Sequence, residues 1–207
     1  MEKAFRWLTL LLLAGSVLGC LPLERNAVLI HPQEAGVLVR AVGTPDEKVS
    51  DTPLGPGWHL VNCNTDQVII YSTVHTAVTL ADNMEAGRPA VEARTEDGHL
   101  VVIEITVIFR VTPKTVVQVY RAFGTDDYVN SFVIPIVQTT VRDVISRYGV
   151  LEVWEARADL PLWDGLNEEL KTRLLSGGIE LQDSVIRNVI LSQESLDMIQ
   201  ATVAPHE

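Results

Sequence analysis

Two cysteines and five histidines are the side chains of this sequence best suited to metal binding or acid–base chemistry. The histidines are His31, His59, His75, His99 and His206. Their spacing supports no zinc site, because the sequence has no H-x-x-x-H, H-E-x-x-H or C-x-x-C pattern. It also has no G-x-S-x-G nucleophile elbow and no Walker loop. We therefore predict no catalytic residue, no metal and no cofactor, and interpret His59 and His75 as hydrogen-bonded structural groups.

An acidic group in the second half of the sequence is the other feature that could suggest a binding site, in this case for a cation. It comprises Glu152, Glu155, Asp159, Asp164, Glu168 and Glu169. The group lacks the ligand spacing of a calcium-binding loop. We therefore interpret it as a solvated helix face.

Cys20 carries the most specific chemical prediction. The sequence Val17-Leu18-Gly19-Cys20 resembles a bacterial lipobox, in which the cysteine is lipidated and becomes the first residue of the mature chain. Gly19 and Cys20 fit this pattern, whereas Leu18 is larger than the residue usually found there. Lipidation of Cys20 would leave Cys63 without a disulfide partner in the chain, and we expect Cys63 to be a buried thiol.

Residues 1–23 have the layout of a membrane-targeting segment. Lys3 and Arg6 precede a run without charged residues from Trp7 to Leu18, as in secretory signals. The run is shorter than the about 20 residues of a spanning helix. A lipoprotein signal and an uncleaved N-terminal anchor therefore both remain open, with a buried core helix as the third alternative. The first two place the remainder of the chain on the extracytoplasmic face of a bacterial cell membrane.

The net charge of −11 at pH 7 limits the partners of the chain. Nucleic-acid binding requires Lys and Arg to displace counterions from phosphates, so the acidic balance argues against it. The same charge argues against a folded domain that lies flat on an anionic membrane. The 207 residues, 47% of them hydrophobic, suffice for a globular domain with its own core.

The first half of the sequence shows the period of two that is typical of β-strands. We expect one long strand over 67–80 and another over 99–111, whose alternate residues are all apolar. The turn Glu96-Asp97-Gly98 predicts a hairpin that joins the second strand to 90–95. These features indicate an antiparallel sheet with one solvated face.

The second half changes to the helical period. We expect helices over 113–123, from Asp126 or Asp127 to Tyr148, and over 159–176. Pro135 should kink the second helix or mark its true start.

A final strand is expected over 179–191, with Val185 in phase with the inward-facing Ile179 and Leu191, followed by a short helix after Ser192. In the helix before this strand, Glu169 and Arg173 are spaced for an ion pair.

Several local strings follow one another in a specific order along residues 26–200. They are Gly55-Pro56-Gly57-Trp58-His59-Leu60, Glu92-Ala93-Arg94-Thr95-Glu96-Asp97-Gly98, the strand to Arg110-Val111, Asp127-Tyr128-Val129, Pro135-Ile136-Val137, Val141-Arg142-Asp143-Val144-Ile145 and the strand over 179–191. In this order they resemble the band 7 family, also called the SPFH domain, of stomatins, prohibitins and flotillins. Prohibitins are the most similar, because of the Asp-Tyr and Pro-Ile-Val strings.

The resemblance implies an α+β fold of the SPFH type over residues 26–200. An antiparallel-sheet-rich first subdomain would cover 26–112, and a helix-rich α/β subdomain would cover 113–200. Residues 1–23 would be the signal or anchor, and residues 201–207 a tail.

The resemblance also implies a membrane-tethered, non-enzymatic scaffold that self-associates and organises membrane proteins or regulates a membrane protease. The family usually continues into a long coiled-coil helix, whereas this sequence ends at Glu207 after one short helix. We therefore expect contacts through the folded domain rather than a large cage. The alternative is a monomeric extracytoplasmic lipoprotein that binds a ligand or a protein partner, and a hydrolase is the third hypothesis.

Overall fold

The computed structural model describes residues 25–44, 48–62, 64–82, 87–156 and 161–203. The strands are β1 (Arg25–Ile30), β2 (Glu34–Arg40), β3 (Gly57–Asn62), β4 (Asp66–Ser72), β5 (Thr76–Leu80), β6 (Val91–Arg94), β7 (Leu100–Val111) and β8 (Ile179–Leu191). The helices are α3 (Val116–Phe123), the π-helical turn η1 (Val129–Val133), α4 (Ile134–Ile145), α5 (Val150–Glu155), α6 (Pro161–Ser176) and α7 (Gln193–Val203). This combination of antiparallel strands and helices confirms the α+β fold class.

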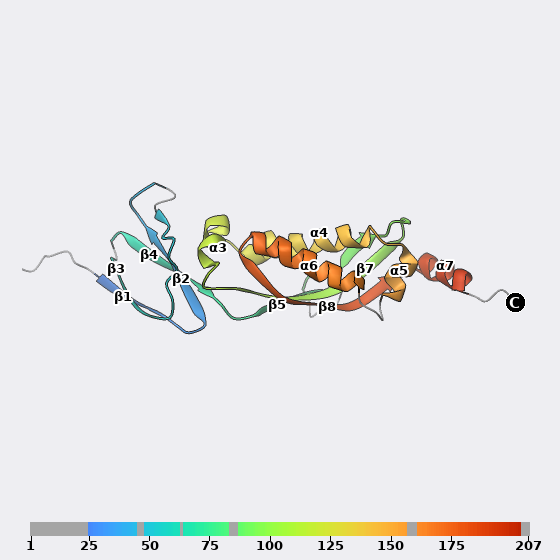
Figure 1. The fold of residues 1–207 in the computed structure, drawn as a ribbon, viewed down its shortest axis with the longest axis horizontal. Helices are drawn as coiled ribbons and strands as arrows, with labels where there is room; N and C mark the ends of the chain where they lie inside the picture. The colour runs from blue at the N-terminus through green and yellow to red at the C-terminus, as the bar shows by residue number, and fades with distance from the viewer. Residues whose placement is uncertain (1–24, 45–47, 63, 83–86, 157–160, 204–207) are drawn as a thin grey trace, which may run out of the picture.

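The molecule is elongated, with β1–β4 at one end and α7 at the other (Figure 1). β1 pairs with β3 and β2 pairs with β4, each as a two-stranded antiparallel sheet. In the larger sheet, β7 pairs along its whole length with β8 on one side, and with β5 and then β6 on the other. The strand that follows the helices, β8, thus pairs with the central strand β7.

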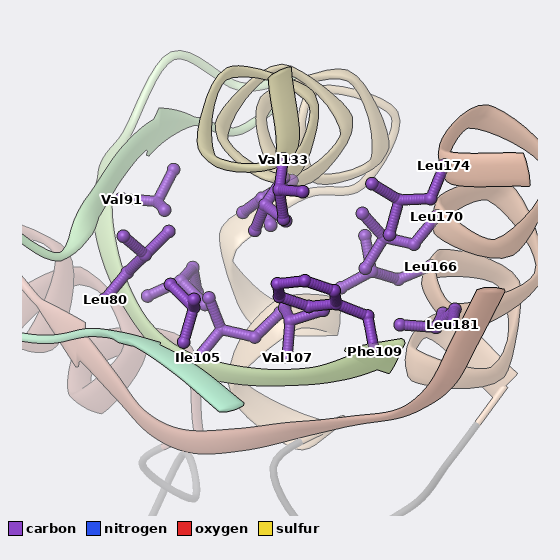
Figure 2. Close-up of a cluster of buried hydrophobic side chains, with 14 of the residues drawn as sticks. Leu80, Val91, Ile105, Val107, Phe109, Val133, Leu166, Leu170, Leu174 and Leu181 are labelled. Atoms are coloured by element: carbon purple, nitrogen blue, oxygen red, sulfur yellow. The ribbon is translucent and has the colours of Figure 1, made fainter. Parts of the chain in front are cut away.

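β7 supplies the sheet side of the core. Its alternate residues are buried, as the sequence predicts, because successive side chains of a strand point to opposite faces. These inward residues are Val101, Ile103, Ile105, Val107, Phe109 and Val111. Figure 2 shows Phe109 and Val107 beneath Val133 and opposite the side chains of Leu166, Leu170 and Leu174 from α6. The helices α4 and α6 therefore cover one face of the sheet (Figure 1).

The expected strand over 67–80 is instead two strands in different sheets. β4 pairs with β2 and β5 pairs with β7, and the chain changes partner at residues 73–75. There the Thr73 backbone N–H donates to the Gln33 carbonyl at 2.8 Å. The apolar alternation in the sequence runs through this change without marking it, because it carries no information on the hydrogen-bonding partner. Ile70 and Val74 are exposed, although they share the parity of the buried Val78 and Leu80.

The expected inward orientation of Val185 is also wrong, since its side chain is 46% exposed. Relative to β7, the strand β8 carries one extra residue between Asn188 and Ile186 and another between Asp183 and Leu181. Each bulge exchanges the two faces of the strand. Between the bulges, the odd-numbered residues therefore face outward, whereas they face inward on either side of the two bulges.

The helices of the second half begin close to the predicted residues. Pro135 is the second residue of α4, directly after the π-helical turn η1, so it marks the start of that helix. Before it, the Asp127 carboxylate accepts hydrogen bonds from the backbone N–H groups of Val129 (3.0 Å) and Asn130 (3.2 Å). The predicted cap Asp159 lies outside the described residues. The six-residue helix α5 is too short for its period to be detected in the sequence.

Candidate functional site

The side chains of His59, His75 and His99 lie in separate parts of the fold, and each contacts another group. His59 Nε2 lies 2.7 Å from the Gly55 carbonyl oxygen, and His75 Nε2 lies 3.3 Å from Gln182 Oε1. In the part of the chain that the structure describes, no group of three or more His, Cys, Asp or Glu side chains could hold a metal ion. Cys20, Cys63 and His206 lie outside the described residues, so lipidation of Cys20 stays a prediction.

Within the described part of the chain, His99 and Ser195 form an arrangement that resembles a nucleophile beside a base. His99 Nδ1 lies 3.0 Å from Ser195 Oγ, and Ser192 Oγ lies 2.8 Å from the same oxygen. Ser195 is completely buried at the start of α7, so its hydroxyl cannot reach a substrate. The Ser195 N–H also donates to Ser192 Oγ at 3.3 Å, which identifies this cluster as the cap of α7.

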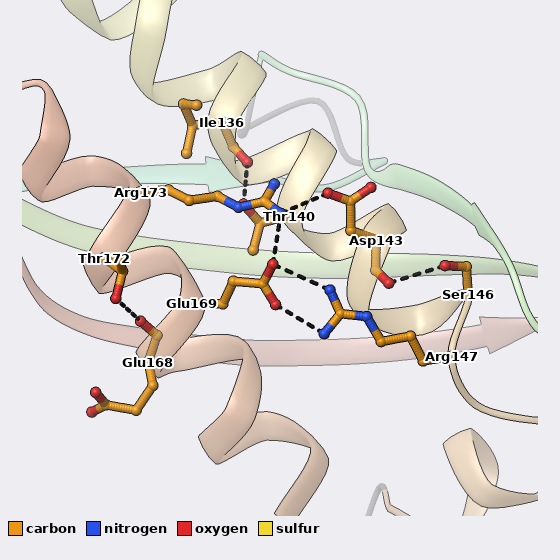
Figure 3. Close-up of polar contacts among 9 residues, drawn as sticks. All are labelled: Ile136, Thr140, Asp143, Ser146, Arg147, Glu168, Glu169, Thr172 and Arg173. Atoms are coloured by element: carbon orange, nitrogen blue, oxygen red, sulfur yellow. Dashed lines mark hydrogen bonds and ion pairs between the residues drawn. The ribbon is translucent and has the colours of Figure 1, made fainter.

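Part of the acidic group forms ion pairs between α4 and α6 (Figure 3). Glu169 pairs with Arg173 at 2.6 Å, as its spacing predicts, and with Arg147 at 3.2 Å. Arg173 also reaches Asp143 of α4 at 2.7 Å, and hydrogen bonding to this carboxylate raises the pKa of Arg173. Glu169 is thus neutralised by two guanidinium groups, which leaves it unsuited to cation binding.

Asp97, in the turn between β6 and β7, holds the start of α5. Both of its carboxylate oxygens accept from the Val150 backbone N–H, at 3.2 and 3.0 Å, and the Thr95 hydroxyl also donates to it. Desolvation opposes ionisation of Asp97, but these hydrogen bonds outweigh it, so its pKa lies below the usual value. The turn therefore supports the start of α5. Sequence patterns could not predict this contact, because Asp97 and Val150 are far apart in the chain.

A shallow hollow of about 490 Å³ lies along β8, between Trp163 and the segment 184–189. The hydroxyl group of Ser184, which is part of the lining, donates to Asn167 Oδ1 at 3.2 Å. Among the residues that the structure describes, the lining contains the cation Arg187 and no carboxylate. This composition lacks the paired acid and base that catalysis would require.

Two features at the other end of the molecule were not predicted as sites. The first is an apolar surface on the ribbon of β1 and β3, here called the outer ribbon face and defined by Ala27, Leu29, Trp58 and Leu60. Register pairs Leu29 with Trp58 and Ala27 with Leu60, so these side chains share one side of the ribbon. All four are exposed, with exposed fractions of 70% for Trp58 and 68% for Leu60. Their common parity in the two strands is the signal that could have predicted this surface.

The second feature is an aromatic junction between β4 and the helices. The Tyr71 hydroxyl donates to the Gly124 carbonyl just after α3. The Phe123 ring lies 5.0 Å from the Phe132 ring and 6.4 Å from the Tyr128 ring, measured between centroids. Burial, followed by the charges of Tyr120 and Tyr128, raises the pKa of Tyr71 from 10.0 to about 12. The junction thus connects the sheet of β2 and β4 to the helical layer.

The junction predicts a dependence of stability on alkaline pH. Since the folded-state pKa of Tyr71 exceeds the unfolded value of 10.0, its contribution is complete below pH 10 and is lost as pH rises to about 12. Tyr71→Phe should therefore flatten the decrease of the unfolding free energy over this interval. At neutral pH the variant should lose about 1 kcal/mol with the hydrogen bond to Gly124. Urea unfolding of both proteins from pH 8 to pH 11.5 measures the two effects, and parallel pH profiles would contradict the assignment.

The family model described as SPFH domain / Band 7 family matches residues 28–206. The matched range includes the whole of every element from β2 to α7. No curated protein matches the chain. Among the residues that the structure describes, none of the helices has both the length and the apolar character needed to cross a membrane.

Proposed function

The chain belongs to the SPFH domain / Band 7 family, and from this premise we propose that it is a membrane-tethered, non-enzymatic scaffold that self-associates. Family members associate with membranes and oligomerise. The observation that carries the proposal is the position of the matched range: it begins at residue 28, directly after a segment with the layout of a targeting signal.

The tether in this proposal is residues 1–23, with a lipid on Cys20 or an uncleaved helix as its two forms. Both forms place the folded domain on the extracytoplasmic face of a bacterial cell membrane. The domain itself is residues 26–200, with a sheet-rich part (26–112), a helix-rich part (113–200) and a tail (201–207). Confinement to a surface raises the effective concentration of the domain and so favours weak contacts between copies.

The scaffold role is supported by how the fold uses its reactive groups. The buried Ser195, the paired Glu169 and the engaged His59 each stabilise local structure. We propose that the partners are further copies of the chain and a membrane protein, of which a membrane protease is one class. The elongated sheet-and-helix body offers long side surfaces for such contacts (Figure 1).

The tether is tested by expressing the full chain in a bacterium and recording the mass of its mature N-terminus. We expect a diacylglycerol-modified Cys20 in protein from the membrane fraction, and an unmodified chain that retains residues 1–19 for Cys20→Ala. An intact N-terminus in wild-type protein that stays with membranes would identify the helical anchor instead. Wild-type protein released by an alkaline wash would contradict a tether of either kind.

Self-association is tested on the same membranes by chemical cross-linking. Scaffold function predicts cross-linked dimers and larger species for the wild-type chain, at a yield that falls when the membranes are diluted with lipid by fusion. A monomer at every surface density would favour the alternative, a monomeric lipoprotein that binds a ligand or a protein partner.

A further inference from the structure

The outer ribbon face is unusual because large apolar side chains are exposed there while the opposite side of the same ribbon is packed. Ile30 and Val61, at the alternate positions, are buried. Successive side chains of a strand point to opposite sides, so Trp58 and Leu60 point away from the packed side. The ribbon thus carries apolar residues on both of its sides. A face of this kind requires a partner to remove it from water.

The charge of the ribbon limits what that partner can be. The chain has 27 Asp and Glu residues, yet β1 and β3 contain none of them. Both strands consist of apolar residues, Asn, Gly, one Arg and one His. The acidic remainder of the chain would repel an anionic partner. The ribbon has no carboxylates in its strands, so it can approach such a partner.

The proposed tether brings this ribbon to a membrane. Arg25, the first residue of β1, follows Cys20 by five positions and Leu23 by two. Even a fully extended chain spans only about 3.5 Å per residue, so β1 begins within about 17 Å of a lipid on Cys20. A helical anchor that ends at Leu23 would bring it within about 7 Å. Either tether therefore keeps the ribbon beside the bilayer.

We propose that the outer ribbon face inserts into the lipid interface, with Trp58 at the depth of the headgroups and Leu29 and Leu60 beside it. This inference rests on the proposed membrane tether. Tryptophan prefers the membrane–water interface, because its ring is apolar and its indole N–H is polar. The contact orients the long axis of the molecule relative to the bilayer, so that the tethered domains present the same side surfaces to one another.

The size of the face favours lipid over a second copy of the chain. A large aromatic side chain buries about 150–250 Å², so these four residues offer at most about 500 Å². A stable protein interface needs about 800 Å² on each partner. Shallow insertion into lipid has no such threshold, since the tether already supplies most of the attachment.

The experiment uses the full chain with Trp7→Phe, which removes the tryptophan of the tether and leaves Trp58, Trp154 and Trp163. Trp154 belongs to α5, toward the end of the molecule opposite β1 and β3 (Figure 1), and Trp163 Nε1 donates to the Ala156 carbonyl at 2.8 Å. The protein is reconstituted in phosphatidylcholine–phosphatidylglycerol vesicles with and without brominated acyl chains, floated on a gradient, and its tryptophan emission is recorded. We expect bromine to quench part of the emission, and Trp58→Phe in the same background to abolish that quenching.

Leu175→Trp, added to the protein without Trp7 and Trp58, is the matched control. Leu175 is an exposed apolar residue of α6, and tryptophan there should not be quenched. Floating protein whose Trp58 emission is unaffected by bromine overturns the inference and leaves the tether standing. A shift of Trp58 emission to shorter wavelength without quenching overturns it in favour of a second copy. Protein that does not float overturns the tether and the inference together.

Discussion

Phe109→Ala is expected to lower the free energy of unfolding by about 3–5 kcal/mol. Phe109 has no exposed surface and is among the largest fully buried side chains of the described residues. It lies on β7, the strand to which β5, β6 and β8 are all hydrogen-bonded, and it faces the leucines of α6 (Figure 2). Its loss removes contacts to both layers, and the surrounding strands are held too firmly by their neighbours to fill the cavity.

Denaturant unfolding of wild type and variant measures this effect, with Val185→Ala as the control. Val185 lies on the adjacent strand but faces solvent between the two bulges. Its truncation should change the free energy of unfolding by no more than about 0.5 kcal/mol. Equal losses for the two variants would mean that the bulges, and hence the phase of β8, are placed incorrectly.

β7 and its hairpin could be predicted from sequence because their determinants are local. The alternation in β7 is unbroken, and Gly98 occupies the positive φ of 87° that the turn requires. Pro135 and Asp127 likewise act within a few residues of the helix start that they define. Each of these elements is fixed by residues adjacent in the chain, and a single sequence contains that information.

The features that were wrongly predicted or missed from the sequence are each determined by a residue or strand far away in the chain. Residues 73–75 leave one sheet for another, which depends on where β2 and β7 lie. The phase of Val185 depends on the pairing of β8 with β7. The start of α5 is capped by Asp97, 53 residues away. None of these partners leaves a periodic signal in the segment that it determines.

The candidate sites also differ in whether a local sequence pattern could predict them. Cys20 is predicted by a four-residue string, and the outer ribbon face could have been read from the parity of Trp58 and Leu60. The Tyr71–Gly124 hydrogen bond joins residues 53 positions apart, and no local pattern anticipates it. The junction that fixes the sheet of β2 and β4 against the helices therefore depends on the folded chain and not on any local pattern.

Gly177, in the turn between α6 and β8, tests how tightly this junction is packed. A Cβ atom at this buried position would lie 2.5 Å from Cε1 and 2.7 Å from Cζ of Phe132. Phe132 cannot move freely, because its ring already contacts Phe123. The backbone of Gly177 does not require glycine, since its φ is not in the left-handed region. A methyl group here therefore causes a steric conflict with one ring and no backbone strain.

Gly177→Ala is accordingly expected to destabilise the protein by about 1–3 kcal/mol, the usual cost of overpacking. The same substitution at Gly165, an exposed position within α6 where a Cβ would meet nothing within 4 Å, should instead stabilise by about 0.5–1 kcal/mol. Phe132→Leu should recover part of the loss in the Gly177→Ala background, so that the two changes are not additive. Unfolding of the four proteins of this cycle measures the coupling. Additive losses would show that Phe132 does not form the wall of the site, and the position of η1 against the α6–β8 turn would then need another explanation.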